Sequence, residues 1–202
     1  MRLFAAIELP EAVIDELHDW WRQAVPALDA DDWRPVSPHL WHMTLAFYGD
    51  VSGHDADDLA EALVECAALT PPLILKTGGS GFFPGPARPR VFWAGVRDAA
   101  PDGQLKRLAH CCRRAGHATV RKRTAKESAF RGHITVARGR GFPAPVGMAD
   151  VQLLPEVPPI NWRAASLSLF QSILQPDGPQ YRRLETFELK GSTMGTRGKD
   201  VR

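Results

Sequence analysis

Two short segments of the chain carry the same pair of polar side chains at the same spacing. Residues 42–45, HMTL, and residues 133–136, HITV, each read histidine, any residue, threonine and an aliphatic residue. Successive side chains of a strand point to opposite faces, so each segment predicts a strand with an imidazole and a hydroxyl on one face. One copy alone fits ordinary alternation on a half-buried strand. Two copies favour one site built from two parts of the chain.

Two imidazoles and two hydroxyls are suited to phosphodiester cleavage. Histidine titrates near pH 6.5, so one ring can accept a proton while the other donates one. One histidine would activate water or a hydroxyl, and the other would protonate the leaving oxygen. The threonine hydroxyls can donate hydrogen bonds to the non-bridging oxygens. This scheme does not require a metal, because positioning and hydrogen bonding carry most of the catalysis in phosphoryl chemistry.

The elements that must position these motifs follow from hydrophobic periodicity and from Gly and Pro. The pattern predicts helices over 11–25, 55–69 and 104–115, with Gly116 ending the last one. It predicts strands over 2–9, 40–48, 73–77, 90–96, 130–137, 163–174 and 181–190. Gly- and Pro-rich loops are expected over 78–89 and 139–160. Two runs of strand, helix and motif strand indicate an α+β fold with antiparallel sheets and helices on their outer faces.

Composition excludes several classes of protein. The net charge of +2 rules out a strongly basic nucleic-acid binder of the histone type. No segment reaches the ~20 apolar residues of a membrane span, and we expect a cytoplasmic protein. Glycine-rich phosphate loops of the dinucleotide-binding and P-loop types are absent from the sequence. The three cysteines lack C-x-x-C spacing, so we expect no disulfide framework, and neighbouring helix positions argue against a metal site at His110, Cys111, Cys112 and His117.

The chain resembles the two-histidine phosphoesterases, specifically the LigT-like RNA 2',3'-cyclic phosphodiesterases. The resemblance covers nearly the whole chain and rests on segments in the expected order: "MRLFAAIELP", "WRPVSPHLWHMTLAFYGDV", "RPRVFWAGV", "FRGHITVAR" and "LSLFQSIL". One departure is Gly132, which stands where the family usually has proline before the second motif.

The resemblance implies one bilobal, pseudo-symmetric domain over residues 1–190, with two antiparallel sheets lining a central cleft. Residues 191–202 are polar and rich in glycine, so we expect them to form a flexible tail. It implies a monomer that hydrolyses the 2',3'-cyclic phosphate at the end of RNA or an oligonucleotide to a 2'-phosphomonoester, without metal or another cofactor. His42 would be the proton donor and His133 the proton acceptor, although the sequence alone allows these roles to be exchanged. Thr44 and Thr135 match the positions that hold the phosphate.

Other functions remain open on the same residues. Reversible 2'-5' RNA ligation, or cleavage of another cyclic nucleotide, would use the same histidines with a different acceptor or substrate. A non-catalytic RNA-binding module is a third possibility, and the two complete motifs argue against it. Basic residues over 121–131 could provide a local footprint for RNA or be a solvated loop.

Arg138 matches the arginine that closes the second motif and is a candidate phosphate ligand. Strict alternation places it on the face opposite His133, because the two are five residues apart. It can reach the phosphate only if the strand ends or bulges near Ala137; otherwise it is a surface charge.

Overall fold

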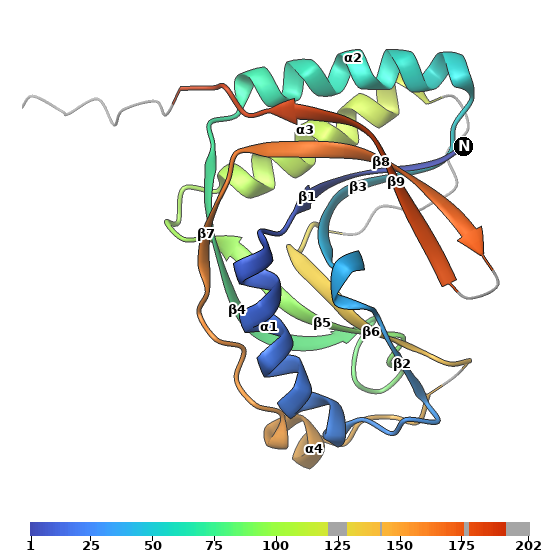
Figure 1. Ribbon diagram of the computed structural model, residues 1–202, viewed down its shortest axis with the longest axis vertical. Coiled ribbons are helices and arrows are strands. Elements are labelled where there is room, and N and C mark those ends of the chain that lie inside the picture. Colours follow the sequence, from blue (N-terminus) through green and yellow to red (C-terminus); the bar gives the residue numbers. More distant parts are fainter. Residues whose placement is uncertain (121–128, 142, 176–177, 193–202) are drawn as a thin grey trace, which may run out of the picture.

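The computed structural model describes residues 1–120, 129–141, 143–175 and 178–192, and its strands form one curled antiparallel sheet (Figure 1). The strands are β1 (Arg2–Glu8), β2 (Trp33–Pro35), β3 (His42–Asp50), β4 (Leu73–Phe83), β5 (Val91–Asp98), β6 (His133–Gly139), β7 (Asn161–Ala164), β8 (Ser166–Gln175) and β9 (Gly178–Glu188). Their order is β7-β4-β5-β6-β3-β1-β8-β9, and β2 pairs with β6. The predicted antiparallel α+β fold is confirmed. The two expected sheets are joined into one where Met43 of β3 lies opposite Ile134 of β6.

Helices cover one face of each half of this sheet (Figure 1). They are α1 (Glu11–Ala24), α2 (Gly53–Leu69), α3 (Gln104–Thr119) and the short α4 (Met148–Leu153), with 3-10 turns at Val25–Ala27 and Pro38–Leu40. The indoles of Trp20 and Trp21 on α1 contact Phe92 of β5. Helices α2 and α3 pack on each other and on the half that contains β3, β8 and β9. No helix in the described part of the chain is long and apolar enough to cross a membrane.

Three boundaries differ from the sequence-based expectation, each because of a tertiary contact. Residues 78–83, expected in a loop, continue strand β4, which pairs with β5 through an irregularity between Thr77 and Ser80. Gly116 lies inside α3 instead of ending it, because the ring of Tyr48 packs where a Cβ atom would be. The strand expected over 163–174 is divided between β7, which pairs with β4, and β8, which pairs with β1. Residues 193–202 of the expected tail lie outside the described residues.

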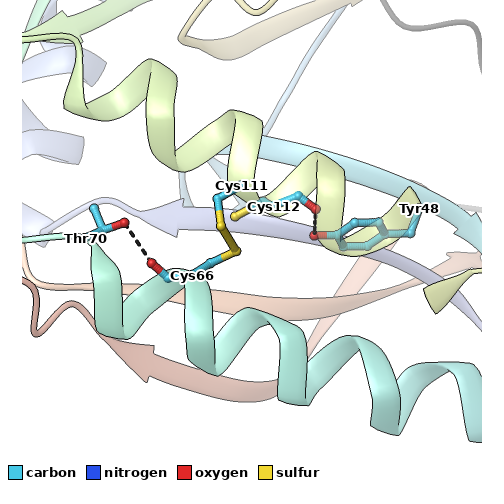
Figure 2. Close-up of a disulfide and its surroundings, with 5 residues drawn as sticks. All are labelled: Tyr48, Cys66, Thr70, Cys111 and Cys112. Atoms are coloured by element: carbon cyan, nitrogen blue, oxygen red, sulfur yellow. Dashed lines mark hydrogen bonds between the residues drawn. A yellow bond between two sulfur atoms is a disulfide. The ribbon is translucent and has the colours of Figure 1, made fainter. Parts of the chain in front are cut away.

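The expectation of no disulfide is wrong for one pair of cysteines. Cys66 on α2 and Cys111 on α3 form a disulfide, with Cα atoms 5.7 Å apart (Figure 2). Cys112 is a buried free thiol, and its backbone carbonyl accepts a hydrogen bond of 3.1 Å from the Tyr48 hydroxyl. Cys66 and Cys111 are brought together by the packing of α2 against α3. The spacing of cysteines in the sequence does not reveal which faces of two helices pack together.

Candidate active site

The two motifs present their polar side chains on the same face of the sheet. Met43 and Ile134 are opposite each other and fully buried, so these two side chains share the helix-covered face. The flanking residues of both motif strands therefore point to the other face. We call the face that carries His42, Thr44, His133 and Thr135 the motif face. These four side chains are partly exposed, as a site that admits a substrate requires.

Both histidines are oriented by the same local hydrogen bond. Nδ1 of His42 lies 2.8 Å from the carbonyl oxygen of Leu40, and Nδ1 of His133 lies 2.7 Å from that of Arg131. A carbonyl oxygen only accepts, so each Nδ1 carries the proton and donates it. Each ring therefore leaves Nε2 for proton transfer. Nε2 of His42 lies 3.1 Å from the Thr44 hydroxyl.

Both imidazoles favour the neutral form. Burial lowers the pKa of His42 from its ordinary value of 6.5 to about 4; the Arg138 guanidinium and His133 lower it further, whereas the Leu40 carbonyl and Glu8 raise it. Burial also lowers the pKa of His133, with smaller lowering contributions from Arg138 and Arg131. Without a bound anion, both rings are therefore ready to accept a proton at pH 7. The one that acts as an acid must gain its proton when an anion binds.

A bulge brings Arg138 to the motif face. Thr135 lies opposite Trp93 and Ala137 lies opposite Phe92, so Val136 is an extra residue in β6. This insertion resets the alternation, and Arg138 returns to the side of His133. The guanidinium acts electrostatically on both histidines, in agreement with this placement. Of the two possibilities left open by the sequence, the structure has the bulged strand.

Strand β3 carries the same irregularity. Ala46 lies opposite Ala5 and Thr44 lies opposite Ala6, so Leu45 is the extra residue there. Phe47 occupies the place that Arg138 has in β6, and its side chain is 46% exposed. The two halves of the site therefore share the backbone irregularity as well as the motif, but one ends in an aromatic ring and the other in a cation.

Aromatic rings surround both histidines. Tyr181 of β9 meets the His42 ring edge-on at 5.1 Å, and Phe83 of β4 meets the His133 ring edge-on at 4.8 Å. Trp93 also contacts His133, with ring centroids 6.4 Å apart. The sequence did not identify Phe83 and Trp93 as neighbours of the site. Phe83 was missed because it was placed in a loop.

Glu8 was also missed, although it ends a correctly predicted strand. It lies opposite His42 in the β1–β3 pairing. Its carboxylate accepts hydrogen bonds from the Ser168 hydroxyl at 2.7 Å and from the Arg183 guanidinium at 3.0 and 3.2 Å. Pairing of β1 with β3 could have revealed it, since residues opposite a motif histidine share its face.

Several other aromatic and metal-ligating side chains do not join this site. Trp33, Trp41 and Tyr48 are buried. Among the described residues, no three His, Cys, Asp or Glu side chains are grouped closely enough to bind a metal ion. This finding covers the set His110, Cys111, Cys112 and His117. Arg131 stacks its guanidinium 5.3 Å from the Trp93 ring centroid. The basic residues Arg121, Lys122, Arg123 and Lys126 lie outside the described residues.

Comparison with known proteins gives the same family from sequence and from structure. The family described as LigT like Phosphoesterase matches residues 7–93. A protein of Thermus thermophilus named RNA 2',3'-cyclic phosphodiesterase is 33% identical over 95% of this chain and 91% of its own length. One of the same name from Archaeoglobus fulgidus is 29% identical over 93% of this chain and its full length.

Solved structures agree over nearly the whole chain. The crystal structure of TT0787 of Thermus thermophilus superposes with a TM-score of 0.80 at 31% identity, covering 96% of this chain and all of that one. E. coli LigT complexed with 3'-AMP has the same fold, with a TM-score of 0.71 at 22% identity over 93% of this chain and 97% of that one. With paired motifs on one face of a shared sheet, this chain belongs to the LigT-like phosphoesterases of the two-histidine superfamily.

Proposed function

We propose that this protein is an RNA 2',3'-cyclic phosphodiesterase. It hydrolyses the cyclic phosphate at the 3' end of RNA or an oligonucleotide and leaves a 2'-phosphomonoester and a free 3' hydroxyl. The observation that carries the proposal is the matched pair of imidazoles, each with Nδ1 engaged by a backbone carbonyl and Nε2 left for chemistry. The names of the Thermus and Archaeoglobus relatives support this choice of substrate.

In the proposed mechanism, water attacks phosphorus while Nε2 of His133 takes its proton. The bond between phosphorus and O3' breaks, and Nε2 of His42 gives a proton to O3'. The hydroxyls of Thr44 and Thr135 donate hydrogen bonds to the non-bridging oxygens, and Arg138 neutralises charge that builds up on them. The single negative charge of the bound diester favours protonation of an adjacent imidazole, which offsets the effect of burial on the pKa of His42.

Replacing either histidine tests the proposal directly. His42→Ala and His133→Ala should each lose at least ~100-fold in turnover of a nucleoside 2',3'-cyclic phosphate, because each removes one of the two proton transfers. Circular dichroism should show an unchanged fold. Full activity in either variant would contradict the assignment.

Product analysis and chelation test the remaining parts. The expected product is the 2'-phosphate; a 3'-phosphate would reverse the regiochemistry, and a joined 2'-5' oligonucleotide would indicate a ligase. Turnover should be unchanged by EDTA, since the scheme uses side chains alone. Loss of turnover that returns on adding a divalent metal would overturn the metal-free mechanism.

A further inference from the structure

The two motif histidines differ in the residue that lies opposite each of them. Glu8 lies opposite His42, and Gly95 lies opposite His133. A side chain cannot be added at Gly95, because its Cβ would be 2.5 Å from the carbonyl oxygen of Gly78. Only one of the two equivalent positions can therefore hold an acid.

The charges around the two rings differ accordingly. The groups around His42 are Glu8 from β1, Tyr181 from β9, His133 and Arg138 from β6, and the ring of Phe170 from β8. Arg183 of β9 is hydrogen-bonded to the Glu8 carboxylate. The charged groups that act on His133 are two cations, Arg131 and Arg138. A diester anion bound at both motifs favours protonation of either imidazole, so it does not by itself decide which ring becomes the acid. The Glu8 carboxylate breaks this symmetry in favour of His42, because it raises the pKa of that ring, by less than burial lowers it, and has no counterpart beside His133.

We propose that Glu8 is the positioning residue that makes His42, rather than His133, the proton donor. The inference rests on the proposed function and adds the cause of the division of roles. The Ser168 hydroxyl and the Arg183 guanidinium fix the direction of the carboxylate. Glu8 stabilises the imidazolium of His42 in the bound state, and Arg183, whose charge opposes that effect, limits it. Neither residue touches the reacting atoms.

The pH profile of kcat/KM for a nucleoside 2',3'-cyclic phosphate tests this inference. The rising limb reports the base losing its proton, and the falling limb reports the acid losing its own. Glu8→Gln keeps the shape of the side chain and removes its charge. The midpoint of the falling limb should therefore shift to lower pH by roughly half a unit, while the midpoint of the rising limb stays in place. Arg183→Gln should move the falling limb up. Glu188→Gln, which removes an acid paired with Lys190, is the control and should move neither limb.

Each other outcome overturns the inference. A shift of the rising limb in Glu8→Gln would indicate that His42 acts as the base. A lower rate with both limbs unchanged would mean that Glu8 only supports the structure.

An NMR titration separates this inference from the proposed function. The imidazole signals of His42 and His133 are followed with pH in saturating sulfate, whose charge is constant over this range. The pKa of His42 should fall in Glu8→Gln and rise in Arg183→Gln, while that of His133 stays unchanged. If the wild-type protein fails to turn over the substrate, the proposed function is wrong, and the titration still reports on Glu8. A His42 titration that is the same in all variants would refute the role of Glu8.

Discussion

His42 and His133 are held alike and buried unequally, and this difference should appear in the stability of the protein. The pKa of His42 is about 4 in the folded protein and 6.5 ordinarily, so between these values the unfolded chain binds a proton that the folded chain does not. Stability therefore falls as the pH decreases from about 6.5 towards 4. His42 accounts for about 2 kcal/mol of unfolding free energy lost between pH 7 and pH 5.

Urea unfolding of His42→Asn at the two pH values measures this contribution. The variant should lose less stability than the wild type on going from pH 7 to pH 5, by about 2 kcal/mol. His110→Asn, which changes an exposed histidine of α3, is the control and should keep the wild-type difference. Equal pH dependence in His42→Asn and the wild type would contradict the burial argument.

Arg138 should contribute to catalysis through its charge on the phosphate. Arg138→Gln removes the cation from the motif face, and we expect kcat/KM to fall by roughly 100-fold, the size found when one preorganised donor to a reacting oxygen is lost. Arg138→Lys should restore part of the rate, because the charge returns without the planar fork. The exposed neighbour Arg140, changed to Gln, should leave the rate close to wild type. If the Arg138 and Arg140 variants behave alike, Arg138 is a surface charge.

At the scale of elements, alternation in the sequence located the motif histidines and threonines but did not reveal the bulges. A period of two follows from the backbone of any regular strand, so the face of His42 and Thr44 could be predicted. The extra residue Val136 depends on how β6 pairs with β5, which is a long-range property. Arg138 therefore remained ambiguous until its strand partner was known. Glu8 was missed for the same reason.

Gly116 shows how packing can override a local rule. Glycine normally destabilises the interior of a helix by about 1 kcal/mol relative to alanine. In α3, however, a Cβ added at Gly116 would lie 2.5 Å from Cδ1 of Tyr48. The hydroxyl of Tyr48 donates a hydrogen bond to the backbone carbonyl of Cys112 (Figure 2). Gly116→Ala should therefore destabilise the protein by ~1–3 kcal/mol, the usual cost of overpacking.

Chemical denaturation checks the Gly116 prediction against a matched substitution. Gly53, the first residue of α2, has no atom within 4 Å of the position of an added Cβ. Gly53→Ala should be neutral or slightly stabilising. If both alanine variants were equally stable, the packing of Tyr48 against α3 would not explain why residue 116 is a glycine.

At the scale of the whole molecule, the helix-covered face contributes stability and the motif face contributes catalysis. Breaking the disulfide between α2 and α3 tests whether the two are independent. Cys66 and Cys111 join two helices across 45 residues of chain, which corresponds to about 4 kcal/mol from the loss of chain entropy in the unfolded state. Reduction, or Cys66→Ala, should lower the unfolding free energy by ~2–4 kcal/mol. Below the unfolding transition, turnover should be unchanged. Mass spectrometry of the oxidised protein verifies the bond, and a large loss of kcat on reduction would show that the two faces are coupled.

The site should also couple anion binding to protonation of the whole protein. Sulfate, a tetrahedral oxyanion like the reacting phosphate, should bind to Arg138 and the two imidazoles and raise the unfolding free energy by about 2.7 kcal/mol at 100 times its dissociation constant. Because both histidine pKa values are lowered in the free protein and a bound anion raises them, binding takes up protons, and stabilisation should increase as the pH falls from 8 to 6. Sulfate also stabilises proteins non-specifically. The double variant His42→Ala/His133→Ala, measured at the same ionic strength, gives that background and should show no increase at lower pH. Equal increases in the two proteins would mean that the motif histidines do not form the anion site.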